Sequence, residues 1–184
     1  MRFIPVTALI VALLLGMTSH SVVAQSSFGP EISAEDYLQH VQNLNATKSH
    51  NSKDNFAESL GQSYLNYQFT RLGLSTENIA CNGATLYVAK LPGAVQDIPP
   101  VVYYAPWQKR MQMAGVLEIA ERFLTQRPRP KHPVYFVFGN TMQAQKLQCG
   151  PLKKAGLVLQ PQQLEDLDAI ALVRYLSSLQ IKGK

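Results

Sequence analysis

The chain has 184 residues and a formal net charge of +5, with 46% hydrophobic and 16% charged residues. This length and composition fit one globular domain with its own core, and they exclude a disordered or low-complexity chain. The basic residues are scattered along the sequence, and no aromatic side chains alternate with them to form a base-stacking surface. We therefore expect solvated surface charge and no nucleic-acid partner.

The N-terminus has the pattern of a secretory signal peptide. Arg2 precedes an apolar run over residues 3–15, and small residues precede Gln25. The alternative is an uncleaved membrane anchor, but the run is shorter than the ~20 residues that a spanning helix needs. We predict a signal peptide over residues 1–24 and a single domain over residues 25–184. The protein is then exported, periplasmic or secreted, and has no stable membrane insertion after cleavage.

Two cysteines, Cys81 and Cys149, are present. Thiols tend to pair in an oxidising compartment, and the long loop between these two favours a stabilising disulfide. Geometry decides whether such a bond closes, so the sequence leaves a disulfide and two free thiols equally open. Neither thiol is expected to bind metal, because no His or Cys partner lies at the short spacing of a metal site.

Two helices are predicted first. A capping-box-like pattern begins at Ser33 with Asp36 three residues later, and apolar residues at helical spacing follow. This pattern predicts a helix over residues 34–44. Apolar side chains also recur every three or four positions over residues 54–71, and Gly73 follows where a left-handed cap is favoured. A second helix is therefore expected over that range.

Strands and helices alternate in the rest of the chain. Runs of β-branched, aromatic and other apolar residues predict four strands, over residues 85–91, 101–105, 133–138 and 169–176. Helical spacing predicts a further helix over residues 111–126, which Pro128 and Pro130 end. Short helical turns are expected within residues 146–156 and 161–167. This alternation predicts an α/β fold, a three-layer sandwich with a mixed, partly parallel sheet.

Four framework segments have the order and spacing of a known enzyme family. They are residues 63–74, ending in Leu72-Gly73-Leu74, residues 85–93, ending in Leu91-Pro92-Gly93, residues 114–122 and residues 134–139. The series resembles the secreted zinc aminopeptidases with two co-catalytic zinc ions, to which glutaminyl cyclases are also similar. The resemblance covers residues 33–176, and it implies a zinc-exopeptidase-like domain that is incomplete at its C-terminus.

The resemblance also indicates where metal ligands would lie, and other side chains occupy those positions. Pro106 stands where the family has a ligand His, and Met111 where an Asp bridges the metals. Met142 and Gln143 match a Glu pair, and Arg174, on the predicted last strand, matches a ligand Asp. Paired dications need carboxylates to offset their mutual repulsion. The prediction is therefore no metal cofactor and no catalytic residue.

Other catalytic arrangements are not found in the sequence. The histidines His40, His50 and His132 share no His-x-x-x-His spacing. Each is predicted to be a surface or hydrogen-bonded residue rather than a ligand. No Gly-x-Ser-x-Gly segment marks a nucleophile, and Glu165 with Asp166 is predicted to lie at a solvated helix end.

A binding role for the altered cleft is the remaining prediction, because aromatic and amide side chains gather where the family's active site opens. The candidate binding residues are Tyr104, Trp107, Gln108, Gln112 and Arg174. Such a surface suits a peptide or a partner protein, although core packing is the alternative for the tryptophan.

Three functions stay open. The first is an exported non-catalytic protein that acts as a binding or accessory module. The second is a zinc-dependent aminopeptidase or other hydrolase with non-standard ligands. The third is a truncated remnant with little function. The ligand, the partner and the oligomeric state are not determined by the sequence.

Overall fold

The computed structural model describes residues 31–46, 54–81, 83–95, 97–125, 128–140, 147, 149–162 and 164–184, with the backbone alone for 54–59. The predicted signal peptide, Met142 and Gln143 lie outside these ranges. No helix within them combines the length and the hydropathy of a transmembrane span.

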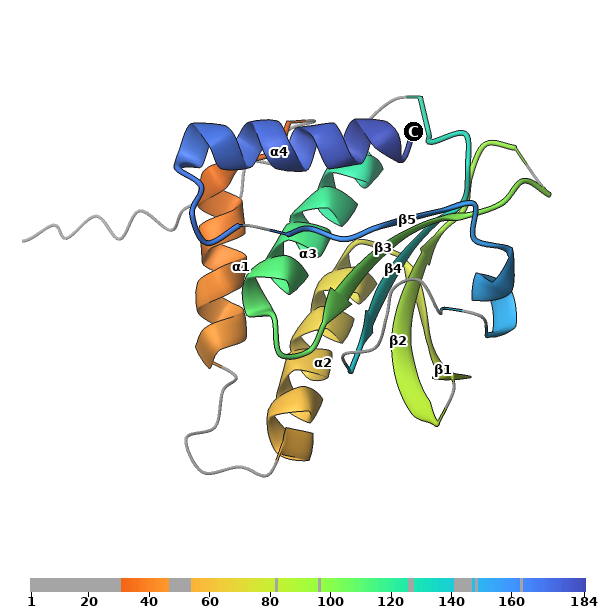
Figure 1. The fold of residues 1–184 in the computed structure, drawn as a ribbon, viewed down its shortest axis with the longest axis horizontal. Coiled ribbons are helices and arrows are strands. Elements are labelled where there is room, and N and C mark those ends of the chain that lie inside the picture. The colour runs from red at the N-terminus through yellow and green to blue at the C-terminus, as the bar shows by residue number, and fades with distance from the viewer. Residues whose placement is uncertain are drawn as a thin grey trace, which may run out of the picture.

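The described strands form one mixed sheet of five strands, in the order β1-β2-β4-β3-β5 (Figure 1). Their bounds are β1 Ser75–Cys81, β2 Ala84–Leu91, β3 Val101–Pro106, β4 Val134–Gly139 and β5 Leu157–Leu159. Strands β1, β2 and β4 are antiparallel neighbours, whereas β4, β3 and β5 run parallel. The prediction of an α/β fold with a mixed, partly parallel sheet is confirmed.

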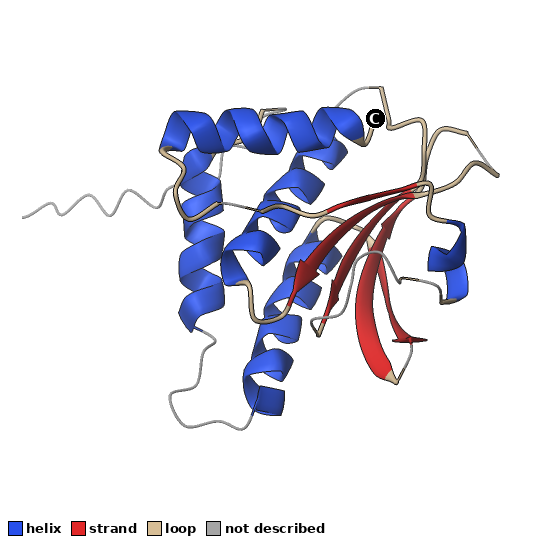
Figure 2. Ribbon diagram, in the orientation of Figure 1, coloured by secondary structure: helices blue, strands red, loops and turns tan. Residues whose placement is uncertain are grey.

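The four α-helices of the described residues lie on one side of this sheet (Figure 2). They are α1 Ala34–Ala46, α2 Asp54–Arg71, α3 Arg110–Thr125 and α4 Ala169–Lys182, with α1 packed on the outside of α3. On the other face, within the described residues, the helical cover is the short 3-10 helix η4 at Gly150–Lys154. The described residues therefore cover the two faces of the sheet very unequally.

Two glycines of the framework motifs have a clear structural reason. Gly73 follows α2 with φ 71°, while Leu74 N–H bonds to Phe69 O and Gly73 N–H to Thr70 O. These two hydrogen bonds form a Schellman cap, which favours glycine at its left-handed position. Gly93 lies against the backbone of residues 131–133, where an added Cβ would come within 2.5 Å of a carbonyl carbon. A side chain at position 93 would force these two segments apart.

The helix face of the sheet carries the larger core. Its centre is an aromatic cluster in which Phe69 of α2 stacks on Phe136 of β4, and Phe136 stacks on Tyr103 of β3. These side chains are fully buried, and each such burial contributes roughly 1.5–3 kcal/mol to stability. Helix α3 is buried on all sides from Met113 to Phe123, because it is enclosed by the sheet, α1 and α4.

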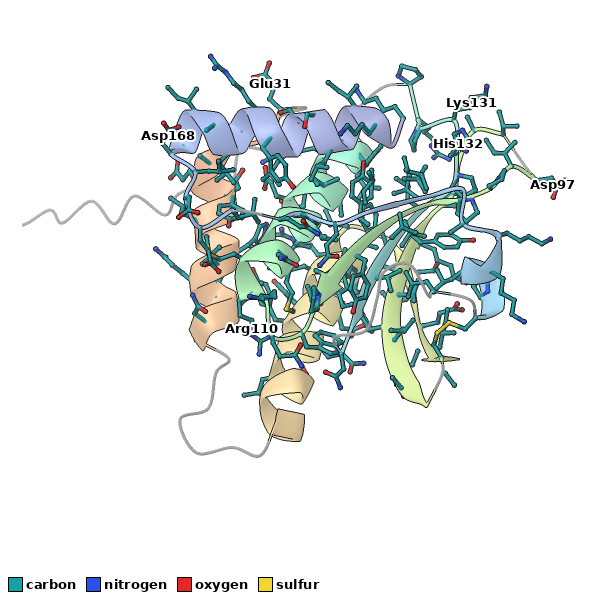
Figure 3. The ribbon with its side chains drawn as sticks, viewed as in Figure 1. Glu31, Asp97, Arg110, Lys131, His132 and Asp168 are labelled. Atoms are coloured by element: carbon teal, nitrogen blue, oxygen red, sulfur yellow. A yellow bond between two sulfur atoms is a disulfide. The ribbon has the colours of Figure 1, made fainter. Side chains whose placement is uncertain are left out.

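The opposite face has a smaller core that a disulfide fastens. Leu147 and Leu152 cover apolar residues of β2, β3 and β4 there. Cys81, the last residue of β1, is bonded to Cys149, which precedes η4, with 5.4 Å between their Cα atoms. Of the two states that the sequence left open, the structure contains the disulfide, which appears as the yellow bond in Figure 3.

The last predicted strand is wrong, because residues 169–176 lie in helix α4. Asp168 caps this helix by accepting a 2.7 Å hydrogen bond from Ala171 N–H, as an N-cap residue does. Leu172, Leu176 and Leu179 point inward at helical spacing. The buried run is therefore one face of a helix, which periodicity alone does not separate from a short buried strand.

Two strands of the structure were not predicted. Strand β1 has an exposed, polar sequence at the sheet edge, so it lacks the apolar alternation that marks a strand. Strand β5 has only three residues. In its register with β3 the next residue to donate would be Pro161, which has no N–H.

Candidate functional site

A hollow of about 460 Å³ opens beside the end of β3, between the start of α3 and the C-terminal half of α1. This is the edge where the resemblance placed the active site. Residues lining the hollow include Val41, Gln108, Lys109, Arg110, Gln112, Glu165 and Asp166. Figure 3 labels Arg110 at the start of α3, next to the connection from β3.

The amide side chains of the hollow are held by other amides. Gln108 Nε2 donates a 3.0 Å hydrogen bond to Asn140 Oδ1 and so links the loop after β3 to the end of β4. Gln112 Oε1 accepts a 3.0 Å bond from Gln160 Nε2. Both predicted glutamines therefore line one hollow in fixed orientations.

The other predicted binding residues lie elsewhere. Trp107 is 3% exposed and packs against Tyr87 and Phe138 in the helix-face core. Tyr104 is buried on the opposite face of the sheet, where its hydroxyl donates to Asn140 O at 3.1 Å. Neither side chain lines the hollow.

Arg174 requires a correction, because it was expected on a strand beside the cleft. It is instead an exposed residue of α4, outside the lining of the hollow. A residue in that helix cannot occupy the strand position of the family's ligand Asp. The correspondence on which its role was predicted is therefore wrong.

A second site, which was not predicted, lies between α1 and α3. It is a cluster of six ionisable residues: Asp36, His40, Arg71, Glu118, Glu121 and Arg122. All of them except Arg71 are buried. Arg122 of α3 is paired with both Asp36 and Glu118, and Arg71 of α2 donates a 3.1 Å bond to Glu121. We call this group the ionic cluster.

The ionic cluster also replaces part of the predicted capping box. Ser33 Oγ accepts from Asp36 N–H at 3.2 Å, as expected of an N-cap. The Ser33 N–H, however, donates to Glu118 Oε1 at 2.7 Å rather than to the Asp36 carboxylate. The Asp36 side chain pairs with Arg122 instead, so tertiary contacts complete a cap that the sequence pattern assigned to local residues.

Burial and charge act against each other on these groups. Burial raises the pKa of Glu118 above its ordinary value, although bonds from Ser33 and Arg122 act in the opposite direction. Burial also acts to raise the pKa of Glu121, but interactions with His40, Arg71 and Arg122 outweigh it, so this pKa lies below its ordinary value. Glu121 is therefore a carboxylate at neutral pH.

His40 occupies the centre of the ionic cluster. Its Nδ1 lies 2.9 Å from the Tyr64 hydroxyl, and its Nε2 lies 3.5 Å from Glu121 Oε1 and 4.0 Å from Glu118 Oε2. His40, Glu118 and Glu121 are the one group of three His, Cys, Asp or Glu residues in the described ranges with atoms close enough to share a metal ion.

The sequence did contain a signal for this cluster. Glu118, Glu121 and Arg122 interrupt an apolar helix at spacings of three and four, and Asp36 and His40 repeat that spacing on α1. Charged residues on a helix that is apolar all round must be buried with partners. The partners themselves come from another helix, however, and spacing cannot identify them.

Comparisons with known proteins give a partial likeness. No family model matches the chain, and no curated protein matches it in sequence. Among solved structures, the Legionella pneumophila LapA aminopeptidase is 14% identical, with 60% of this chain and 35% of that one covered and a TM-score of 0.48.

Two other structures are similar to the same extent. A zinc-dependent exopeptidase from Parabacteroides distasonis is 14% identical over 59% of this chain and 47% of its own, with a TM-score of 0.42. A glutaminyl cyclase from Bacteroides thetaiotaomicron, bound to N-acetylhistamine, is 13% identical over 59% and 47%, with a TM-score of 0.44.

The match spans less than half the length of each of these three proteins. These solved structures are of the same kinds, aminopeptidase, zinc-dependent exopeptidase and glutaminyl cyclase, as the family that the sequence resembles, over part of the chain and at low identity. At these identities the likeness carries no conclusion about activity, metal or substrate.

Proposed function

We propose that this protein is an exported, non-catalytic binding module, and that the hollow beside Gln108 and Gln112 takes a peptide or a segment of a partner protein. The observation that carries the proposal is the chemistry at the end of β3 and the start of α3. Pro106, Trp107 and Met111 stand there, and none of these side chains can hold a zinc ion or take a proton from water.

The size and the lining of the hollow support binding. Its volume of about 460 Å³ lies within the 300–1,000 Å³ range of ordinary ligand sites. Gln108 and Gln112 are oriented by their bonds to Asn140 and Gln160. The Gln108 Oε1 and Gln112 Nε2 are the atoms that would pair with the N–H and C=O groups of a bound peptide.

Charge supports a polar ligand of mixed sign. Lys109 and Arg110 line the hollow at the start of α3, and Glu165 and Asp166 line it from the segment before α4. Export is supported by the N-terminal signal pattern and by the Cys81–Cys149 disulfide, since such bonds persist in oxidising compartments.

The test of catalysis measures hydrolysis of aminoacyl substrates by the purified protein, with added zinc and with a chelator. We expect no turnover above the background in either condition. Zinc-dependent turnover that the chelator abolishes would favour the hydrolase alternative and overturn the non-catalytic proposal. N-terminal sequencing of protein from the exported fraction is expected to begin at Gln25.

The test of binding screens a peptide library by thermal shift and measures the best ligand by calorimetry. Replacing both glutamines, as Gln108→Ala with Gln112→Ala, is expected to weaken binding by about tenfold or more, since each lost hydrogen bond contributes about 1 kcal/mol. The matched control is Gln162→Ala, an exposed amide outside the lining of the hollow. Equal affinities for both variants would show that the hollow is not the site.

A further inference from the structure

We propose that His40, Glu118 and Glu121 form a site for one divalent transition-metal ion between α1 and α3. This site is separate from the metal positions that the family resemblance implies, which lie at the end of β3. It is also independent of the proposed binding function. A depression lined by His40 and Glu121 adjoins the site, and it shares no lining residue with the hollow.

The distances within the group fit a shared ion better than they fit hydrogen bonds. His40 Nε2 is 3.5 Å from Glu121 Oε1 and 4.0 Å from Glu118 Oε2, beyond the 2.7–3.2 Å of ordinary N–H···O bonds. Two ligands at ~2.0–2.2 Å from a tetrahedral zinc ion lie about 3.4 Å apart. The three ligand atoms all lie within 4.8 Å of one another, so a small movement brings them around one centre.

Two polar atoms of the group are buried without a hydrogen-bond partner. They are His40 Nε2 and Glu118 Oε2, whose residues are 5% and 0% exposed. Buried polar atoms in folded proteins are nearly always paired, because leaving one unpaired is costly. The two atoms lie 4.0 Å apart, so one cation between them would satisfy both.

The remaining contacts orient the three ligands. The Tyr64 hydroxyl lies 2.9 Å from His40 Nδ1, and an Nδ1–H donated to that oxygen leaves the Nε2 lone pair directed at the carboxylates. Ser33 N–H and Arg122 Nε hold Glu118 Oε1, which directs Oε2 toward His40. Arg71 Nη2 donates to Glu121 Oε1 at 3.1 Å, the same oxygen that lies 3.5 Å from His40 Nε2, and so orients that carboxylate.

The charges of the ionic cluster leave room for one more cation. It has the three carboxylates of Asp36, Glu118 and Glu121 and the two guanidinium groups of Arg71 and Arg122. The acidic side chains of the cluster therefore outnumber its guanidinium groups by one. An imidazole nitrogen with carboxylate oxygens suits zinc or a similar first-row ion. The adjoining depression of about 250 Å³, lined by His40 and Glu121, leads to the site from solvent.

Metal uptake by the purified protein tests the site. Chelator-treated protein is dialysed against zinc, and separately against cobalt, and bound metal is measured by elemental analysis. We expect one equivalent of either ion, the visible absorption bands of tetrahedral cobalt, and a thermal midpoint that rises with zinc and falls with chelator. Anomalous scattering from crystals of the zinc form is expected to place the ion between α1 and α3.

Variants tie the ion to the named residues. His40→Gln and Glu121→Gln are each expected to weaken zinc binding at least 100-fold, since even changes one shell further out weaken metal affinity by 10–100-fold. The matched control is His132→Gln, whose ring Nδ1 lies 2.8 Å from Pro99 O on the far side of the fold, and it should keep one equivalent. Two variants are used so that misfolding of one leaves the other as the test.

Three results would overturn the proposal. The first is wild-type protein that takes up no zinc or cobalt. The second is a folded His40→Gln variant that keeps one equivalent of zinc with wild-type affinity. The third is an ion found in the hollow at the end of β3. Peptide binding and turnover are measured separately, so failure of the metal site and failure of the proposed function are distinguishable.

Discussion

The two faces of the sheet are stabilised in different ways. The helix face buries an aromatic core beneath four α-helices and encloses the ionic cluster between α1 and α3. On the opposite face, nine of the described residues form a buried cluster, and the Cys81–Cys149 disulfide holds the short segment that covers it. Apolar burial and ion pairing stabilise the first face, whereas a covalent bond compensates for a small core on the second.

The difference shows how a sheet face with a small core can still be stable. Stability from burial scales with the apolar area removed from water, so a small core contributes little. A cross-link between distant residues instead limits the freedom of the unfolded chain. Changes on the helix face are therefore expected to act through packing and charge, and changes on the opposite face through chain entropy.

The largest effect is expected from Arg122→Met on the helix face. The substitution leaves the carboxylates of Asp36 and Glu118, which are 4% and 0% exposed, without their guanidinium partner. Breaking a buried ion pair from one side costs about 3–5 kcal/mol. The free energy of unfolding from urea titration measures the loss. The exposed Arg129→Met variant is the control, and equal stability of the two would contradict the importance of the ionic cluster.

The disulfide is expected to have the next largest effect. Cys81 and Cys149 are 68 residues apart, and losing a bond that closes such a loop costs about 2–4 kcal/mol. The free energy of unfolding, measured by urea titration, should decrease by the same amount when both cysteines are replaced with serine and when the wild-type protein is reduced. Hydrogen exchange should accelerate around η4 and leave α3 protected. An equal loss of exchange protection on both faces of the sheet would contradict the proposed difference between them.

Alkaline pH is expected to destabilise the helix face progressively. Burial, aided by the nearby charge of Glu165, raises the pKa of Tyr37 to about 12, and burial raises the pKa of Tyr103 as well. These phenols are held neutral in the folded state and ionise near 10 when unfolded. Their contribution to the free energy of unfolding is complete below pH 10 and is lost as the pH rises toward 12.

Tyrosinate absorbance and circular dichroism, followed together, check this loss. The part of the absorbance change that occurs at the highest pH should coincide with unfolding, as followed by circular dichroism. Tyr103→Phe should reduce that part. Tyrosine ionisation complete at pH 10 with the fold intact would show that these phenols are accessible to solvent.

The smallest effect is expected from Arg174→Ala. Arg174 is exposed on α4, and exposed substitutions usually change stability by no more than about 0.5 kcal/mol. Peptide affinity should also stay within about twofold of the wild type. A large loss of binding, measured by calorimetry, would mean that α4 contributes to the site after all.

Secondary structure was predictable where local signals agreed. Helix α2 was expected over residues 54–71 and occupies Asp54–Arg71, because helical spacing and the cap at Gly73 point the same way. The run over residues 169–176 was predicted wrongly, since a short apolar run fits a strand or one face of a helix equally well. In the structure the run lies in α4, and the Tyr103 hydroxyl donates a 2.6 Å hydrogen bond to Leu179 O that holds this helix over the sheet.

The candidate sites were predictable only in part. Gln108 and Gln112 were expected together and do line one hollow, because both follow β3 closely in the chain. His40 was expected to be an ordinary surface or hydrogen-bonded residue. Its carboxylate neighbours come from a helix more than seventy residues away, and no spacing in the sequence connects the two segments.

The class of fold, most helix and strand positions and the glycine-dependent turns were predictable from local patterns, since periodicity and backbone sterics act between near neighbours. The closed disulfide, the helical state of residues 169–176 and the contact of His40 with Glu118 and Glu121 became known only from the three-dimensional fold. Those outcomes depend on which surfaces pack together, and packing joins residues that are distant in the chain.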